Sequence, residues 1–144
     1  MQTKITIILL TIITFSCTVE PESLQYGHDA CYTCKMTLMD TKFGAEIVTK
    51  KGKVYKFDDI NCLINFHNSG HELEEDMAYR LVVDFSNPEK LIDAREAFYI
   101  KSNQVKSPMA SQIASFETKE QADLNKKKWQ GIWLSWGELV TEFK

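Results

Sequence analysis

The fold is decided by residues 42–68, which read KFGAEIVTKKGKVYKFDDINCLINFHN. Two runs rich in β-branched and aromatic residues, 42–50 and 54–57, flank a turn centred on Gly52. This pattern predicts a β-hairpin. Residues 60–68 then carry apolar side chains at helical spacing, so the stretch predicts a strand–strand–helix unit.

One face of the expected helix is apolar and carries Cys62, Leu63 and Phe66. We interpret Cys62 as a small buried residue of that face, with a role as metal ligand as the second choice, because free cysteines are among the most buried residues. Asp58 and Asp59 come directly before the helix and are interpreted as turn and capping residues.

The rest of the chain repeats this outline. Strands are expected at 80–85, 97–102 and 112–117, a short helix or turn at 91–96, and a helix at 119–128 capped by Thr118. Phe57-Asp58-Asp59 then aligns with Phe116-Glu117-Thr118. We therefore expect an α+β fold of two similar small ββαβ units packed together, about 26–85 and 86–144. The aromatic residues at 129, 133 and 136 are expected on one helical stripe packed on the body.

Composition excludes several classes of protein. The 144 residues are 44% hydrophobic, which suffices for a packed core and excludes wholesale disorder. The chain has 17 basic and 20 acidic residues and a net charge of −3, so a basic nucleic-acid-binding domain is not expected.

The N-terminus has the pattern of a secretory signal. Lys4 supplies a positive charge, residues 5–15 are apolar, and the small residue Ser16 precedes Cys17. The apolar run is too short to span a bilayer, and the Ser16-Cys17 junction resembles a bacterial lipobox. We expect a lipoprotein signal peptide at 1–16, a lipid-anchored tether at 17–25 that begins with lipidated Cys17, and a folded domain at 26–144.

Soft potential ligands gather in residues 27–39, which read GHDACYTCKMTLM. Cys31, Cys34 and Met36 form a C-x-x-C-x-M motif preceded by His28 and Asp29. Thiolate and thioether ligands together favour Cu(I), a soft monovalent ion. Cys62 and Met109 are further candidates from elsewhere in the chain.

Other chemistries remain open for this motif. Cys31 and Cys34 could form a thiol-redox pair or a strained disulfide. With Cys62 and His67 or His71 they could also bind a structural zinc ion. The two histidines lie beside an acidic run and are expected to be solvated.

The runs 29–66, 80–103 and 107–122 resemble the NosL family, accessory lipoproteins of nitrous oxide reductase assembly. The motifs C-x-x-C-x-M, F-D-D, D-A-x-x-A and P-M occur in the family's order. Lys35 departs from the family, which usually has glycine there. The resemblance implies a fold of two ββαβ units related to organomercurial lyase. That relation leaves a thiolate and aspartate enzyme as a competing hypothesis.

The resemblance also implies a protein of the bacterial cell envelope, anchored by lipid and facing the periplasm. It would carry Cu(I) to an apo-cuproenzyme, expected to be nitrous oxide reductase in denitrification, together with a membrane assembly or transporter complex. It would not itself be an enzyme or bind nucleic acid. Within this interpretation we expect the ligands to be Cys34, Met36, Met109 and Cys31, with His28, Asp29 and Cys62 as second choices.

Overall fold

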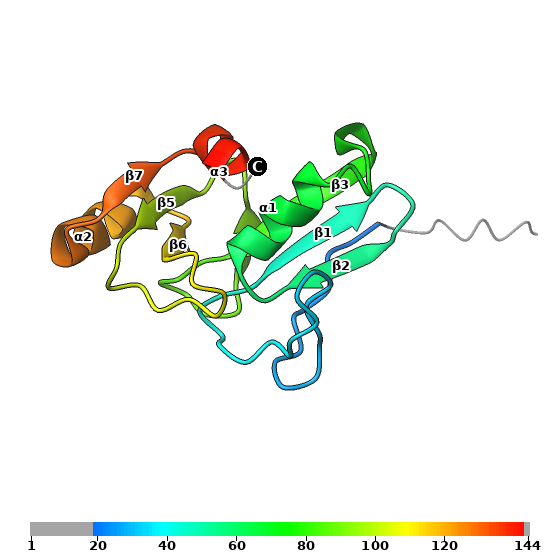
Figure 1. The fold of residues 1–144 in the computed structure, drawn as a ribbon, viewed down its shortest axis with the longest axis horizontal. Helices are drawn as coiled ribbons and strands as arrows, with labels where there is room; N and C mark the ends of the chain where they lie inside the picture. Colours follow the sequence, from blue (N-terminus) through cyan, green and yellow to red (C-terminus); the bar gives the residue numbers. More distant parts are fainter. Residues whose placement is uncertain (1–18, 143–144) are drawn as a thin grey trace, which may run out of the picture.

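The computed structural model describes residues 19–142, which form two small antiparallel sheets and three helices (Figure 1). The expected signal peptide 1–16 and Cys17 lie outside the described residues. No helix within 19–142 is long and apolar enough to cross a membrane.

The first sheet has the strand order β2-β1-β3-β4. Its elements are β1 (Ala45–Thr49), β2 (Val54–Phe57), α1 (Ile60–Asn68), a 3-10 turn (Glu74–Asp76), β3 (Met77–Val83) and β4 (Leu91–Asp93). The hairpin β1–β2 and the helix α1 are where the sequence predicts them. Gly52 closes the hairpin with φ of +80°, a conformation that a residue with a Cβ rarely adopts.

The second sheet has the order β6-β5-β7. It contains β5 (Phe98–Lys101), β6 (Ile113–Phe116) and β7 (Ile132–Leu134), with α2 (Lys119–Trp129) between β6 and β7. In both sheets a hairpin is followed by a helix, and the next strand pairs with the first strand of the hairpin. The expected α+β fold of two ββαβ units is therefore confirmed.

The prediction of a short helix or turn at 91–96 is wrong for its first three residues. They form β4, which pairs with β3 through Val82 and Ile92. Ile92 is buried and its two strand neighbours are less so, the alternation of a strand with one covered face. The side chain of Asp93 then accepts a hydrogen bond from the backbone N–H of Arg95 (2.8 Å), and the chain turns.

The single helical stripe expected at 129, 133 and 136 is also wrong. Trp129 ends α2, Trp133 lies in β7, and Trp136 begins α3 (Trp136–Glu142). Gln130 takes a left-handed conformation after α2, and Gly131 then packs closely on β5. A Cβ on Gly131 would lie 2.5 Å from Cγ2 of Ile100, so only glycine allows β7 to approach β5.

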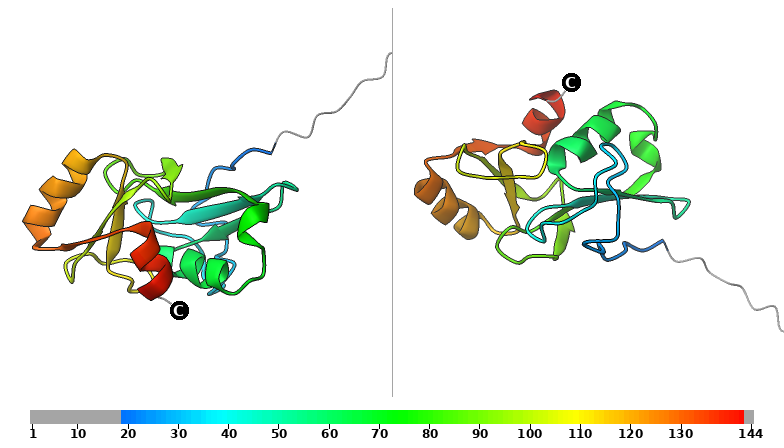
Figure 2. Two further views of the ribbon diagram at one scale, coloured as in Figure 1. Left: turned by 90° about the horizontal axis from the view of Figure 1, so that it is seen from above. Right: turned by 60° about the horizontal axis from the view of Figure 1, so that its bottom comes forward.

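The two units share contacts through α3. Leu139 of α3 belongs to the larger hydrophobic cluster, which joins residues of α1 and the first sheet with Tyr99 and Ile113 of the second sheet. Asn68 at the end of α1 donates a hydrogen bond to the carbonyl oxygen of Val140 (2.8 Å). Figure 2 shows α3 beside α1, at the side where the two sheets meet. A smaller cluster, with Phe116 and Ala122, lies under α2.

Residues 27–39, here called the Cys loop, lie along the outer side of β2 (Figure 1). β2 is an edge strand, and the N–H of Tyr32 donates to the carbonyl oxygen of Lys56 (2.8 Å). The ammonium group of Lys56 also pairs with Asp29 (2.8 Å) and Glu22 (3.1 Å). The loop is thus attached to the sheet by backbone and side-chain contacts.

Candidate metal centre

The Cys loop folds back on itself as a short hairpin. The N–H of Cys31 donates to the carbonyl oxygen of Met36 (2.8 Å), and the N–H of Lys35 donates to that of Cys31 (2.9 Å). Lys35 has φ of +67°, in the left-handed region that favours glycine. The loop therefore has a glycine-like backbone at the position where the sequence departs from the family.

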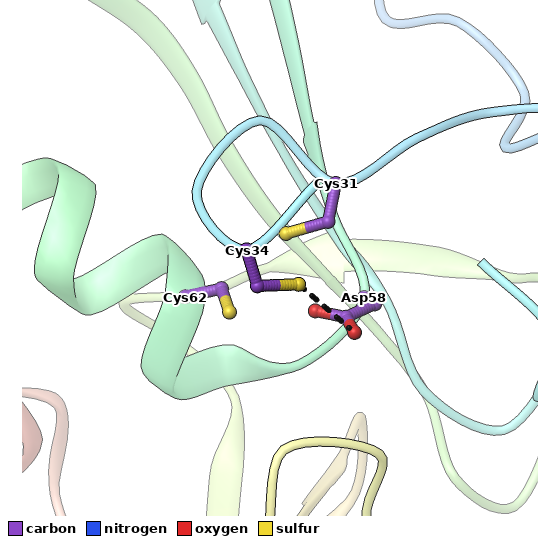
Figure 3. Close-up of side chains that lie close together, drawn as sticks. All are labelled: Cys31, Cys34, Asp58 and Cys62. Carbon is purple, nitrogen blue, oxygen red and sulfur yellow. Dashed lines mark hydrogen bonds between the residues drawn. The ribbon is translucent and has the colours of Figure 1, made fainter. Parts of the chain in front are cut away.

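Three thiols and one carboxylate converge beneath this loop (Figure 3). One potential ligand atom from each of Cys31, Cys34, Asp58 and Cys62 lies within 4.8 Å of the others. The three cysteines are free thiols. We call these four residues the thiol cluster.

Two structural elements position the second pair of donors. Asp58 directly follows β2, and Cys62 lies in the first turn of α1. The hydroxyl of Thr33 donates to the carbonyl oxygen of Cys62 (2.9 Å), which ties the Cys loop to α1. The strand–helix junction therefore brings Asp58 and Cys62 beneath the C-x-x-C motif.

The three thiols differ in burial and in acidity. Cys31 and Cys62 are buried, and Cys34 is partly exposed. A hydrogen bond from the Cys62 thiol lowers the pKa of Cys31 to about 6, although burial opposes this shift. The same hydrogen bond, followed by burial, raises the pKa of Cys62 well above its usual range. Burial raises the pKa of Cys34 to about 11. These shifts favour a thiolate on Cys31 over one on Cys34 or Cys62.

Asp58 adds an oxygen donor to this set. The Cys34 thiol donates a hydrogen bond to Oδ2 of Asp58 (3.4 Å). The other oxygen, Oδ1, is buried and has no hydrogen-bond partner among residues 19–142. A buried carboxylate oxygen without a partner is costly, and binding a cation would satisfy it.

The methionines of the Cys loop point outward. The exposed fractions of Met36 and Met39 are 55% and 72%. Met109 is partly buried and packs against the larger hydrophobic cluster, which includes Cys31 and Cys62. The structure thus brings Cys31 and Cys34 together and places Met36 at the surface of the same loop.

The interpretation of Asp58 and Asp59 as turn and capping residues needs correction. Asp59 occupies the N-cap position of α1, but its side chain makes no capping hydrogen bond. Instead it accepts hydrogen bonds from residues of the second unit, Met109 and Ser111. Asp58 belongs to the thiol cluster, and the sequence analysis did not identify it as a potential ligand.

The second-choice residues lie in different surroundings. His28 is exposed, and Asp29 is paired with Lys56.

The expectation that His67 is solvated is wrong, because α3 brings Trp136 against its ring and leaves the side chain 9% exposed. His71 is exposed as expected, and its Nε2 lies 3.4 Å from the hydroxyl of Tyr32.

A family model for NosL matches residues 24–143. The chain belongs to the NosL family. No curated protein matches the sequence. The structure resembles the crystal structure of the copper chaperone NosL from Shewanella denitrificans, with a TM-score of 0.69 and 23% sequence identity. The match covers 84% of this chain and 96% of that one, and it shows the NosL fold.

Membership of the NosL family confirms the resemblance read from the sequence motifs. The match begins at residue 24, so it includes the whole Cys loop, both sheets and α3. The thiol cluster therefore lies inside the NosL domain of this chain.

Proposed function

We propose that the protein binds Cu(I) at the thiol cluster and passes it to an apo-cuproenzyme, with nitrous oxide reductase as the first recipient to test. The protein is then a carrier, and Cu(I) is its cargo. One observation carries the proposal: the sulfur atoms of Cys31, Cys34 and Cys62 lie within 4.8 Å of one another, and two of the three thiols are buried. Soft thiolates of this kind favour Cu(I) over harder divalent ions.

Burial and exposure of the donors fit a carrier. Cys31 and Cys62 are buried, so a bound ion would be shielded from water on that side. Cys34 is partly exposed and Met36 more so, which leaves one side of the site open to an incoming ligand. A ligand from the recipient could enter there and displace Cys34 while the buried thiolates still hold the ion.

Membership of the NosL family and the copper chaperone of Shewanella denitrificans support the copper assignment. Attachment to the cell envelope through lipid on Cys17 belongs to the same proposal and is supported by the Ser16-Cys17 junction. A lipid anchor would keep the carrier near membrane-bound assembly proteins, such as a copper transporter complex.

Zinc binding is the second candidate, and the number of donors favours it. Three thiols and Asp58 supply four ligands, the number that a structural zinc site requires. Zinc would use all four and leave no open position, whereas Cu(I) needs fewer ligands and can be released.

Competition under anaerobic conditions separates the two candidates. The full chain is titrated with Cu(I) against a Cu(I) chelator and with Zn(II) against a Zn(II) chelator. We expect one Cu(I) per chain and much weaker zinc binding. Tight tetrahedral zinc with no preference for Cu(I) would establish the second candidate.

Two aspartate variants then test the site. Asp58→Asn removes the carboxylate charge of the cluster, and Asp84→Asn makes the same change at a buried aspartate outside it. Zinc binding should fall in Asp58→Asn under the zinc model. Under the copper model both variants should keep most of their Cu(I) affinity, because the thiolates dominate.

Transfer is tested by mixing the copper-loaded chain with apo nitrous oxide reductase.

A further inference from the structure

A loop of the second unit, residues 107–112, is fastened to the N-terminal end of α1 by Asp59. This carboxylate is fully buried. Its Oδ2 accepts hydrogen bonds from the N–H groups of Met109 (2.9 Å) and Ser111 (3.4 Å). Its Oδ1 accepts one from the hydroxyl of Ser111 (2.6 Å). All these donors come from one loop of the other unit.

Met109 is held on its other side as well. The side-chain amide of Asn61 donates to the carbonyl oxygen of Met109 (3.0 Å). Both backbone polar groups of Met109 are therefore bound by side chains from residues 58–62. The same short segment supplies Asp58 and Cys62 to the thiol cluster, so the two sets of contacts share one backbone.

The backbone of the loop needs such support. Ala110 has φ of +56° and Gln112 has φ of +61°, and neither is glycine. Left-handed conformations of this kind cost about 1 kcal/mol or more each and persist where surrounding contacts hold them. The hydrogen bonds to Asp59 flank Ala110 on both sides, which accounts for its conformation.

We propose that Asp59 and Asn61 are positioning residues that hold Met109 beside the thiol cluster, so that its thioether serves as a Cu(I) ligand from the second unit. The inference rests on the proposed copper function. Met109 packs against the hydrophobic cluster that contains Cys31 and Cys62, and its backbone is bound by Asp59 and Asn61, the chain neighbours of Asp58 and Cys62. Asp59 and Asn61 then act as partners that orient a ligand without touching the metal.

A double-mutant cycle on the full chain tests this role. Cu(I) affinity is measured by chelator competition for the parent, Asp59→Asn, Met109→Leu and the double variant. Asp59→Asn keeps the volume but replaces one acceptor oxygen with an NH2 group. We expect Asp59→Asn to weaken Cu(I) binding about 10- to 100-fold, the usual effect of losing an orienting partner, and Met109→Leu to weaken it at least as much because it removes the thioether itself. Because both act through one thioether, the double variant should be no weaker than Met109→Leu alone.

X-ray absorption of the copper-loaded proteins gives a signature that a merely structural role would not change. Asp59→Asn should show one sulfur ligand fewer than the parent, as Met109→Leu does. Asn61→Ala removes only the contact to the Met109 carbonyl, and it serves as the test if Asp59→Asn does not fold. Asp84→Asn, at a buried aspartate away from the loop, should leave both readouts unchanged.

The outcomes separate this inference from the proposed function. Parent-like Cu(I) binding by Met109→Leu would overturn the inference and leave the copper function standing. The inference would also be overturned if Asp59→Asn lowered Cu(I) affinity by the same factor in the parent and in Met109→Leu, since Asp59 would then act through another group. A parent chain that bound no Cu(I) would overturn both.

Discussion

The thiol of Cys34 donates a hydrogen bond to the carboxylate of Asp58 across 3.4 Å, although the two residues are 24 positions apart in the chain. Asp58 stands at the end of β2, and Cys34 lies in the loop that covers that strand. A residue that looks like a turn residue in the sequence thus belongs to the thiol cluster, and the following predictions test that cluster and its surroundings.

Cys62→Ala should weaken Cu(I) binding, because the structure places its sulfur in the thiol cluster. It should also lower the free energy of unfolding by about 1 kcal/mol through a small cavity. Ile64→Val is the matched control, since it removes one buried methyl group from the same helix but no sulfur. Chelator competition and thermal melts on both variants provide the comparison. Unchanged Cu(I) affinity in Cys62→Ala would mean that Cys62 is only a small buried residue of the helix face, as the sequence indicated.

Met36→Leu should weaken Cu(I) binding while leaving stability within about 1.5 kcal/mol of the parent, because the swap nearly conserves volume. Met39→Leu on the same loop is the control, and it should change neither property. Both side chains are more than half exposed, at 55% and 72%, so neither substitution disturbs a core. Equal effects of the two substitutions would remove Met36 from the ligands that the sequence analysis expects.

Cu(I) loading should release a number of protons that depends on pH. At pH 7.5 Cys31, with its pKa lowered to about 6, is already a thiolate, whereas Cys34 and Cys62 hold their protons because their pKa values are raised. A three-thiolate complex would therefore release about two protons at pH 7.5 and about three at pH 5. Calorimetry in buffers of different ionisation enthalpy measures this number. Release of one proton at pH 7.5 would mean that only one further thiol binds.

Glu46→Gln should stabilise the protein above pH 6. Glu46 is fully buried in β1, and its Oε2 has no hydrogen-bond partner among the described residues. Burial raises its pKa to about 6 from an ordinary value of 4.5, so the folded state favours the protonated form. Its contribution is present below pH 4.5 and is lost as the pH rises through 6.

Urea unfolding at pH 4.5 and pH 7.5 measures the effect of this change. Glu46→Gln should gain roughly 1–2 kcal/mol over the parent at pH 7.5 and almost nothing at pH 4.5. Glu96→Gln, at an exposed position, should show no such difference. A gain of equal size at both values of pH would mean that ionisation of Glu46 is not the cause.

Cys17→Ala should abolish lipid labelling and leave the precursor uncleaved or the protein released from the membrane. Stable anchoring requires the two or three acyl chains of a lipoprotein, since one chain binds only marginally. Labelling with a fatty-acid probe in bacterial cells, with Cys62→Ala as the control, checks this prediction. Unchanged labelling of Cys17→Ala would contradict it.

The sequence predicted the parts of the fold that depend on local patterns. Phe57 ends β2 three residues before α1 begins, and Phe116 ends β6 three residues before α2 begins, as the alignment of the two segments requires. Thr118 accepts the capping hydrogen bond from Gln121, although the distance of 3.4 Å is long. These features follow from hairpin turns, helical spacing and capping residues. Each of these depends on residues that are close together in the sequence.

Features that depend on distant contacts could not be predicted in this way. The break between α2 and β7 depends on how closely Gly131 approaches Ile100, 31 residues earlier in the chain. Asp59 has the sequence position of a helix cap, yet its carboxylate accepts a hydrogen bond from the hydroxyl of Ser111 and none from the N–H groups of α1. The C-x-x-C motif indicated Cys31 and Cys34, but only the contacts of the Cys loop with β2 and α1 bring Asp58 and Cys62 beside them.

The position of the Cys loop along β2 also bears on the solubility of the protein. An uncovered edge strand offers its backbone groups to a strand of another molecule and so favours aggregation. The hydrogen bond from Tyr32 to Lys56, together with the ion pair between Lys56 and Asp29, occupies part of that edge. Detachment of the loop would free the four residues of β2 for pairing between molecules. The Cys loop thus covers part of an edge at which the first sheet would otherwise be open to pairing with another molecule.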